Sequence, residues 1–287
     1  MRYRTIGGTT VGAIGLGGMP MSIEGRPDEY RSIRTIHAAL DAGVTLIDTA
    51  DAYHLLAGET GHNERLIAKA LASYPGDTSN VLVATKGGHV RPGDGSWQVD
   101  GSPAHLRQAA EASLKALGVD AIGLYQFHRP DPKVPYAESI GAVKELLDEG
   151  KIRLAGISNA TIEQIDIARK ILGEHNLASV QNQFSPAFRS SEEELAHCAE
   201  LGIAFLPYSP LGGIAQAGNL GSRHAAFGQV AEAHGVSPQQ VALAWMLAKA
   251  PVVIPIPGAS RPESIIDSAQ AADLTLTAAE LAQLDQS

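Results

Sequence analysis

The sequence predicts an α/β protein, a (β/α)8 TIM barrel with an N-terminal β-hairpin cap. Short apolar runs alternate along the chain with longer segments of helical periodicity, which favours parallel strands joined by crossover helices. Most of the runs are continuously apolar before their last residues, as expected for strands buried on both faces. Eight of them fit into 287 residues, a length that one barrel accommodates. An open doubly wound sheet is the alternative.

The expected strands are short and rich in β-branched or apolar residues. The first is the glycine-rich run GAIGLGG, and the second, VTLID, ends at an aspartate. In chain order we expect strands at residues 12–18, 44–48, 80–85, 121–128, 152–158, 178–183, 203–209 and 252–258.

The segments between the strands have helical spacing. In the first of them, Ile33, Ile36 and Leu40 recur at intervals of three and four residues, which places them on one helix face. Several of these segments end in a glycine, the residue that helix C-termini favour. We expect helices at residues 28–43, 63–73, 103–118, 135–150 and 161–173.

The beginning of the chain, RYRTI-GG-TTVG, predicts a hairpin that covers one end of the barrel. No linker, low-complexity tract or strong internal repeat interrupts the rest. We therefore expect one domain over residues 1–287.

The composition is that of a soluble globular protein, with 44% hydrophobic and 18% charged residues. A formal net charge of −9 argues against nucleic acid and anionic membranes as partners, because the mean field repels phosphate. The single cysteine, Cys198, can form no internal disulfide, and no signal peptide or membrane helix is predicted. We expect a cytoplasmic protein, and nothing in the sequence indicates a protein partner.

Polar residues stand at the ends of the expected strands. In a (β/α)8 barrel these ends form the active site. Each residue alone has an ordinary explanation, such as a helix cap or a turn, but all of them converge on one rim. They are Asp48, Tyr53, Lys86, His128, Ser158, Asn159, Gln181, Tyr208 and Ser209.

This set suits proton transfer by a tyrosine. A free tyrosine has a pKa of about 10, and a nearby ammonium lowers it. Lys86 can supply the ammonium, and Asp48 can keep a buried lysine charged. His128 can orient a carbonyl oxygen by a hydrogen bond. The site would protonate that oxygen from Tyr53 while a cofactor delivers hydride to the carbon.

The four residues Asp48, Tyr53, Lys86 and His128, in this order, resemble the aldo-keto reductase family. Other segments carry the same resemblance over residues 3–269: GVTLIDTADAYH, ATKGG, GKIRLAGISN, SVQNQFSP, LPYSPLGG and IPIPGASRPESI. The resemblance implies NAD(P)H-dependent reduction of an aldehyde or ketone to an alcohol, without a metal. It is greatest to the bacterial branch of pyridoxal and general aldehyde reductases.

The resemblance also implies how the cofactor is bound. Tyr53 is the general acid, tuned by Lys86 and Asp48. Ser158, Asn159 and Gln181 would hold the nicotinamide carboxamide, and Tyr208 would stack on its ring. Further residues would lie along the pyrophosphate: Ser209, Leu211 and Gly213.

The segment GASRPES, which begins at Gly258, predicts a phosphate site after the last strand. Ser260 and Glu263 have the spacing of a capping box, and a helix N-terminus there attracts anions. Arg261 adds a positive charge, so we expect NADPH as the cofactor, with NADH possible. Family members often carry arginine where Ser264 stands and a Glu-Asn pair where Asp267 and Ser268 stand. An ordinary capped helix is the alternative.

Residues near the site leave two interpretations open. His54, Leu55 and Leu56 follow the predicted acid, where family members often have glycine, and either line the substrate mouth or pack the loop. The same choice holds for Trp97, Met19 and Met21.

Two rival functions remain at this stage. A regulatory protein that binds cofactor with little turnover is one, and a metal-dependent barrel hydrolase is the other. The hydrolase is suggested by four histidines, His54, His62, His89 and His128. None of them has the H-x-H or H-E-x-x-H spacing that is typical of metal sites. The glycines at 12, 15, 17 and 18 do not fit G-x-G-x-x-G. We expect them to let the first strand end pass close to the cofactor.

Overall fold

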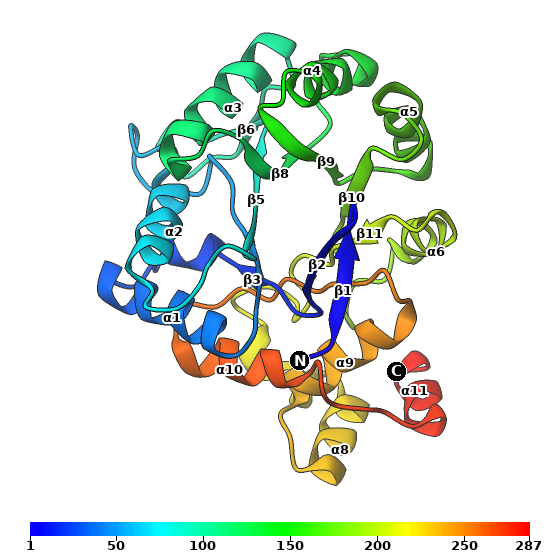
Figure 1. Ribbon diagram of the computed structural model, residues 1–287. Helices are drawn as coiled ribbons and strands as arrows, with labels where there is room; N and C mark the ends of the chain where they lie inside the picture. Colours follow the sequence, from blue (N-terminus) through cyan, green and yellow to red (C-terminus); the bar gives the residue numbers. More distant parts are fainter.

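The computed structural model describes residues 1–287, and a curled parallel sheet lies at its centre (Figure 1). Neighbouring strands follow the order β11-β10-β9-β8-β5-β4-β3, and each pair is parallel. The bounds are β3 Leu16–Gly17, β4 Leu46–Asp48, β5 Leu82–Gly87, β8 Ile122–Phe127, β9 Ile152–Ser158, β10 Leu177–Gln181 and β11 Ala204–Phe205. The first and seventh strands are shorter than their predicted ranges, 12–18 and 203–209.

An eighth segment, residues 252–258, closes the sheet between β11 and β3. The amides of Gly15 and Gly17 donate to the carbonyl oxygens of Pro255 and Pro257, both at 2.9 Å. On the other edge, the amide of Ile254 donates to Phe205 at 2.9 Å. The two prolines have no N–H, so they can only accept hydrogen bonds from the β3 side. This explains why the last predicted strand is irregular although the (β/α)8 barrel is confirmed.

Helices surround the barrel, and one follows each strand. The five predicted helices are confirmed close to their expected bounds. In order, the main helices are α1 Glu29–Asp41, α2 His62–Ser73, α3 Pro103–Leu117, α4 Tyr136–Asp148, α5 Ile162–Leu172, α6 Glu192–Leu201, α9 Pro238–Lys249 and α10 Pro262–Gln270. Additional elements lie outside this repeat: β6 His89–Val90, β7 Gln98–Val99, α7 Leu220–Arg223, α8 Ala225–His234, α11 Ala278–Asp285, and 3-10 turns at Met19–Met21 and Ala217–Asn219.

The N-terminal hairpin, β1 Tyr3–Ile6 and β2 Thr9–Gly12, lies across one opening of the barrel (Figure 1). Its turn is Gly7-Gly8, and both glycines have positive φ (52° and 85°), as a tight hairpin turn requires. Ile6 and Val11 are fully buried against the apolar side chains inside the barrel. The predicted hairpin cap is therefore confirmed, and it fills the end of the barrel where the strands begin.

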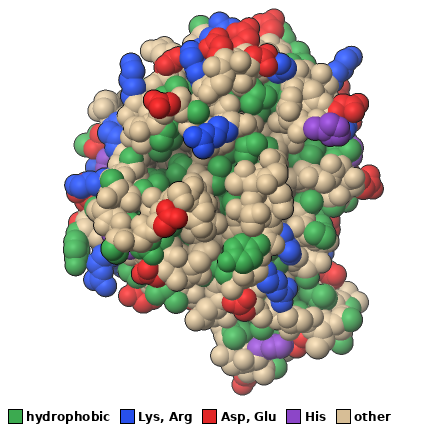
Figure 2. Space-filling model, viewed as in Figure 1, with side chains coloured by type: hydrophobic (Ala, Val, Ile, Leu, Met, Phe, Trp, Pro, Cys, Tyr) green, Lys and Arg blue, Asp and Glu red, His purple; other side chains and the backbone are tan.

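The outer surface at the hairpin end of the barrel carries charges of both signs. Figure 2 shows charged side chains of both signs scattered over the face that carries the hairpin, with no large area of one sign. None of the helices combines the length and the hydropathy that crossing a membrane would require.

Candidate active site

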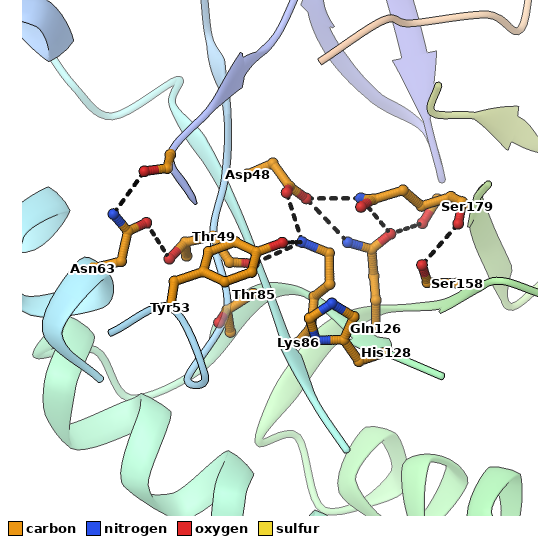
Figure 3. A network of polar contacts seen from close by, with 12 residues as sticks. Asp48, Thr49, Tyr53, Asn63, Thr85, Lys86, Gln126, His128, Ser158 and Ser179 are labelled. Carbon is orange, nitrogen blue, oxygen red and sulfur yellow. Dashed lines mark hydrogen bonds and ion pairs between the residues drawn. The ribbon is translucent and has the colours of Figure 1, made fainter. Parts of the chain in front are cut away.

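Lys86 lies at the centre of the candidate site, fully buried at the end of β5. Its Nζ donates to Asp48 Oδ1 at 2.6 Å, to the carbonyl oxygen of Thr49 at 2.8 Å and to Tyr53 Oη at 3.2 Å. Figure 3 shows the Tyr53 hydroxyl and the Asp48 carboxylate converging on this ammonium. The structure thus brings three of the four predicted catalytic residues together through one positive charge.

Burial and charge compete in this group. Burial alone would lower the pKa of Lys86, but Asp48 and then Tyr53 outweigh it and leave the pKa raised, so the ammonium stays charged. Burial raises the pKa of Tyr53, and Lys86 opposes this only in part. Lys86 therefore acts in the predicted direction, but burial outweighs it, and the net pKa of Tyr53 lies above its usual value rather than below it. Tyr53 keeps its proton at neutral pH, which is the form a general acid needs.

His128, the fourth predicted catalytic residue, directly follows β8 and is 7% exposed. Its ring meets the Tyr53 ring edge to face, with the centroids 5.9 Å apart. Burial, and after it the charge of Lys86, lowers the pKa of His128 well below its usual value. The imidazole is therefore neutral and can donate one N–H to a substrate oxygen. Its Nδ1 is buried without a hydrogen-bond partner.

Two glutamines hold the second oxygen of Asp48. Gln181 Nε2 donates to Asp48 Oδ2 at 2.8 Å, and Gln126 Nε2 approaches the same oxygen at 3.4 Å. Ser179 Oγ in turn donates to Gln126 Oε1 at 3.2 Å. Sequence reasoning missed Gln126. The available signal was a glutamine inside the apolar run LYQF, two residues before His128 and hence on the same face of the strand.

Asn63 anchors the loop that carries Tyr53. It is fully buried, and its Oδ1 accepts from Thr49 Oγ1 at 2.7 Å. Its Nδ2 donates to the carbonyl oxygen of Gly18 at 2.9 Å and to Ser22 Oγ at 2.7 Å. Asn63 therefore joins the start of α2 to the ends of β3 and β4, and sequence reasoning missed this role as well.

His54, the residue after Tyr53, is packed inside the loop. His54 is 1% exposed, and its Nδ1 contacts the carbonyl oxygen of Leu56 at 2.9 Å. Arg91 donates to the carbonyl oxygen of His54 and pairs with Glu24 at 2.5 Å. None of residues 54–56 lines the cavity. Loop packing is therefore the better interpretation for His54, whereas the Leu56 side chain is exposed.

A cavity of about 340 Å³ lies over these groups. Met19 and Trp97 line it, so both belong to its wall, whereas Met21 is buried in the core between α1, α2 and the sheet. Lys86 lies beneath the lining. The predicted site residues that line the cavity are Asp48, Tyr53, His128, Ser158, Asn159, Gln181, Tyr208, Ser209, Leu211, Gly213 and Gly258.

Glycines bring the segment 252–258 close to β3. A Cβ on Gly17 would lie 2.9 Å from the carbonyl oxygen of Ile256, and one on Gly258 would lie 2.9 Å from Pro20 Cγ. Gly17 and Gly258 both line the cavity and pair with each other in a parallel bridge. Gly17 therefore allows the close approach of the neighbouring segment that closes the barrel, whereas Gly258 leaves room for Pro20 in the turn after β3.

The predicted carboxamide-binding residues form a polar wall of the cavity. Ser158 Oγ donates to the carbonyl oxygen of Gln181 at 2.7 Å. Asn159 Oδ1 accepts from Tyr208 Oη at 2.7 Å, and its Nδ2 donates to the carbonyl oxygen of His128 at 3.0 Å. Asn159 and Ser209 are the non-glycine residues with positive φ, at 57° and 49°. Such backbone strain gathers at functional sites.

The start of α10 differs from the prediction. The helix begins at Pro262, and Arg261 rather than Ser260 occupies the N-cap, with no side-chain cap. The predicted capping box is therefore wrong, and Arg261 Nε instead donates to Ser264 Oγ at 2.8 Å. Capping boxes occur at Thr161 and Thr277. Ser260 and Arg261 lie outside the cavity lining, although Gly258, just before them, belongs to it.

Of the four histidines, His89 and His128 lie together, with ring centroids 4.3 Å apart, but the four do not gather at one point. His62 Nδ1 contacts Ser22 Oγ at 2.8 Å, and His89 Nδ1 contacts the carbonyl oxygen of Gln98 at 3.0 Å. No three histidine, cysteine, aspartate or glutamate side chains in residues 1–287 form a group that could hold a metal ion. The geometry does not favour the hydrolase alternative.

Comparison with known proteins decides the family. The profile described as "Aldo/keto reductase family" matches residues 13–287, nearly the whole chain. The chain belongs to the aldo/keto reductase family. It is accordingly an oxidoreductase with the (β/α)8 barrel of that family.

Individual relatives cover the chain almost completely. An uncharacterized oxidoreductase of Schizosaccharomyces pombe is 34% identical over 98% of this chain and 88% of its own length. The glycerol dehydrogenase of Gluconobacter oxydans has a similar structure, with a TM-score of 0.84 and 29% identity over 99% of this chain and 94% of that one. An aldo-keto reductase of Klebsiella pneumoniae in complex with NADPH has a TM-score of 0.80 and 31% identity, over 100% of this chain and 95% of that one.

Proposed function

We propose that this aldo/keto reductase uses NADPH to reduce a small aldehyde or ketone to the alcohol. The single observation that carries the proposal is the position of Tyr53. Its hydroxyl lies 3.2 Å from the Lys86 ammonium, at a cavity that the neutral imidazole of His128 also lines. This geometry supports a proton donor and an orienting N–H acting on the same carbonyl oxygen.

Each residue has a separate part in the reaction. The Tyr53 hydroxyl gives its proton to the carbonyl oxygen as negative charge develops there. Lys86 stabilises the phenolate that Tyr53 becomes, because its Nζ donates directly to Oη. Asp48 keeps Lys86 charged and in place. His128 orients the carbonyl oxygen towards Tyr53 with an N–H donor.

The cavity fits a nicotinamide cofactor, which supplies the hydride when bound. Gln181 lines the cavity and its Oε1 accepts no hydrogen bond from the protein, so a carboxamide N–H has an acceptor there. Ser158 and Asn159 would complete the carboxamide site, and Tyr208 offers a ring for stacking. Ser209, Leu211 and Gly213 would lie along the pyrophosphate.

The choice of NADPH rests on charge after the last strand. Arg261 is exposed at the N-terminus of α10, where a helix dipole also favours a phosphate. The Klebsiella relative binds NADPH. Asp267 is held by hydrogen bonds from Ser237 Oγ and Gln240 Nε2, both at 2.7 Å. NADH remains the alternative cofactor, and its relative affinity is measurable.

The decisive test replaces Tyr53 with phenylalanine. We expect Tyr53→Phe to lower kcat for a panel of aldehydes, pyridoxal included, by about 10²- to 10⁴-fold. Binding of NADPH, followed by quenching of protein fluorescence, should be nearly unchanged. Tyr74→Phe is the matched control, since this tyrosine contacts Asp41 on the outer surface. Unchanged turnover in Tyr53→Phe, or no binding of either cofactor by the natural protein, would contradict the proposal.

A further inference from the structure

Arg129 has no role in the reaction described so far, yet it lies at the reaction cavity. It directly follows His128 at the end of β8, is exposed, and lines the cavity. Its positive charge contributes to lowering the pKa of His128 and of His89, after burial in each case. The charge of the guanidinium is therefore felt in the part of the cavity where a substrate would bind.

The charge of Arg129 is not neutralised by the protein. No carboxylate lies within 4.0 Å of its nitrogens, since none of the ion pairs of the chain includes it. The acid nearest in sequence, Asp131, accepts instead from the backbone amides of Gly101 and Lys133, both at 2.9 Å. The acid in the cavity lining, Asp48, is paired with Lys86.

Arg129 is also the only cation in the lining. The two histidines beside it, His89 and His128, both have lowered pKa values and are neutral at pH 7. Arg91 lies over the ring of Trp97, 4.5 Å from its centroid, but it is outside the cavity lining and pairs with Glu24. The cavity of a chain with net charge −9 thus contains one uncompensated positive charge.

Two hydrogen bonds hold the guanidinium in position. Nε donates to His89 Nε2 at 3.3 Å, and Nη2 donates to Asn159 Oδ1 at 3.1 Å. His89 can accept because its other nitrogen, Nδ1, donates to the carbonyl oxygen of Gln98. The Tyr208 hydroxyl also lies close enough for Arg129 to oppose the rise that burial causes in the Tyr208 pKa, and Nη1 makes no hydrogen bond of its own within the protein. A fixed guanidinium with free N–H groups is suited to a carboxylate.

The rings of His89 and His128 lie between the Arg129 guanidinium and Tyr53. The centroids of His89 and His128 are 4.3 Å apart, and those of His128 and Tyr53 are 5.9 Å apart. Trp97 covers the same side, with its ring 5.4 Å from His89 and 6.4 Å from Tyr53. A substrate with its carbonyl at Tyr53 could therefore reach Arg129 across one aromatic ring or a short chain.

We propose that Arg129 binds an acidic group of the substrate, so that this enzyme prefers aldehydes or ketones that carry a carboxylate. The inference rests on the proposed function and specifies its substrate class. A carboxylate fits better than a phosphate monoester, which carries about two negative charges at neutral pH. The cavity lining offers only one cation, which matches one carboxylate.

The test compares 4-carboxybenzaldehyde with its methyl ester, methyl 4-formylbenzoate, which lacks the negative charge and carries one additional methyl group. We expect kcat/KM to favour the acid by about 10-fold or more, and Arg129→Gln to reduce this acid-to-ester ratio by about 10- to 100-fold. Arg129→Lys should retain part of the preference, and added salt should weaken it. Arg129→Gln also removes a hydrogen bond to Asn159 and so affects cofactor binding. Because both substrates use the same bound cofactor, this effect cancels in the ratio of their kcat/KM values.

Arg153→Gln is the matched control, because Arg153 is an exposed, unpaired arginine on β9 and lies outside the cavity lining. It should leave the ratio unchanged. A ratio near one in the natural protein, or the same ratio in Arg129→Gln, would overturn the inference while leaving the reductase function intact.

A binding experiment tests the inference without turnover. In calorimetric titrations, sodium benzoate should bind more tightly than neutral benzamide, and Arg129→Gln should abolish that difference. Equal binding of the two compounds to the natural protein would overturn the role of Arg129. If no carbonyl compound is reduced but benzoate binding still depends on Arg129, the reductase function fails and the anion site stands.

Discussion

The two ends of the barrel are built from the same strands but have opposite chemistry. Where the strands begin, their inward side chains are apolar, including Leu46, Leu82 and Leu124, and the hairpin packs on them. Further along the same strands, Asp48, Lys86 and Gln126 take the corresponding inward positions, because side chains on one face recur every second residue. The change from apolar to polar thus occurs within two to four residues of each strand.

This difference shows how a buried charge is made stable. A buried ion pair costs solvation energy, and it is tolerated when each charge has its partners. Here, the Lys86 ammonium has three acceptors, and the Asp48 carboxylate has donors on both oxygens. The apolar end supplies the free energy of folding that keeps these groups in place. Substitutions at the two ends should therefore have different effects.

The largest effect should come from Lys86→Met. This change leaves Asp48 buried without its counter-charge, so we expect the free energy of unfolding to fall by about 3–5 kcal/mol. Activity should fall by about 10²-fold or more, because Tyr53 loses its charged neighbour. Chemical denaturation and steady-state kinetics measure the two losses. The double variant Asp48→Asn/Lys86→Met should recover stability without activity, whereas the exposed Lys69→Met should change neither.

At the other end, Ile6→Ala should destabilise the protein without impairing the chemistry. Ile6 is fully buried between the hairpin and the barrel interior, and its truncation should cost about 2–5 kcal/mol. The value of kcat at a temperature where the variant is folded should stay within about twofold of the natural protein, since no site residue moves. Thr10→Ala, on the exposed side of the same hairpin, should have little effect. A large loss of kcat in Ile6→Ala would show that the two ends are coupled.

Asp51 tests how the polar end depends on pH. Burial, and then the charge of Glu64, raises its pKa well above the usual value, and its Oδ1 has no hydrogen-bond partner. A raised pKa means that folding favours the protonated acid, so this contribution to stability is present below the unfolded pKa of about 4 and is lost as the pH rises above it.

We therefore expect Asp51→Asn to stabilise the protein at pH 7 by about 1–3 kcal/mol, with little gain at pH 4. Thermal unfolding over this pH range measures the effect. The exposed Asp120→Asn should show no such trend. A gain that is the same at pH 4 and pH 7 would contradict the assigned cause.

The smallest effect should come from Gln126→Leu. Gln126 is one of two donors to Asp48 Oδ2, and Gln181 at 2.8 Å is the closer one. Loss of the more distant donor should cost about 1 kcal/mol in stability and lower kcat by less than about 10-fold. The exposed Gln229→Leu is the control. A loss as large as that of Lys86→Met would mean that Gln126, and not Gln181, holds Asp48 in place.

Local patterns in the sequence were sufficient for the framework. Alternation of apolar runs with helical periodicity predicted the barrel, and Gly7-Gly8 between β-forming residues predicted the hairpin. The polar residues at the strand ends predicted which side chains would meet, because parallel strands present their C-terminal ends at one rim. Asp48, Tyr53 and Lys86 are accordingly in hydrogen-bonding contact.

Other properties depend on distances between segments far apart in the chain, and only the tertiary structure decided them. The pKa of Tyr53 rises because burial outweighs Lys86, and burial is set by the whole cavity wall. The start of α10 depends on where the segment 252–258 leaves the barrel, so a local capping pattern at Ser260 misplaced it by one residue. The charge of Arg129 stays uncompensated because no carboxylate from any other element lies close enough to pair with it. Periodicity encodes which face a residue occupies, whereas partners and burial are fixed only when all elements are packed together.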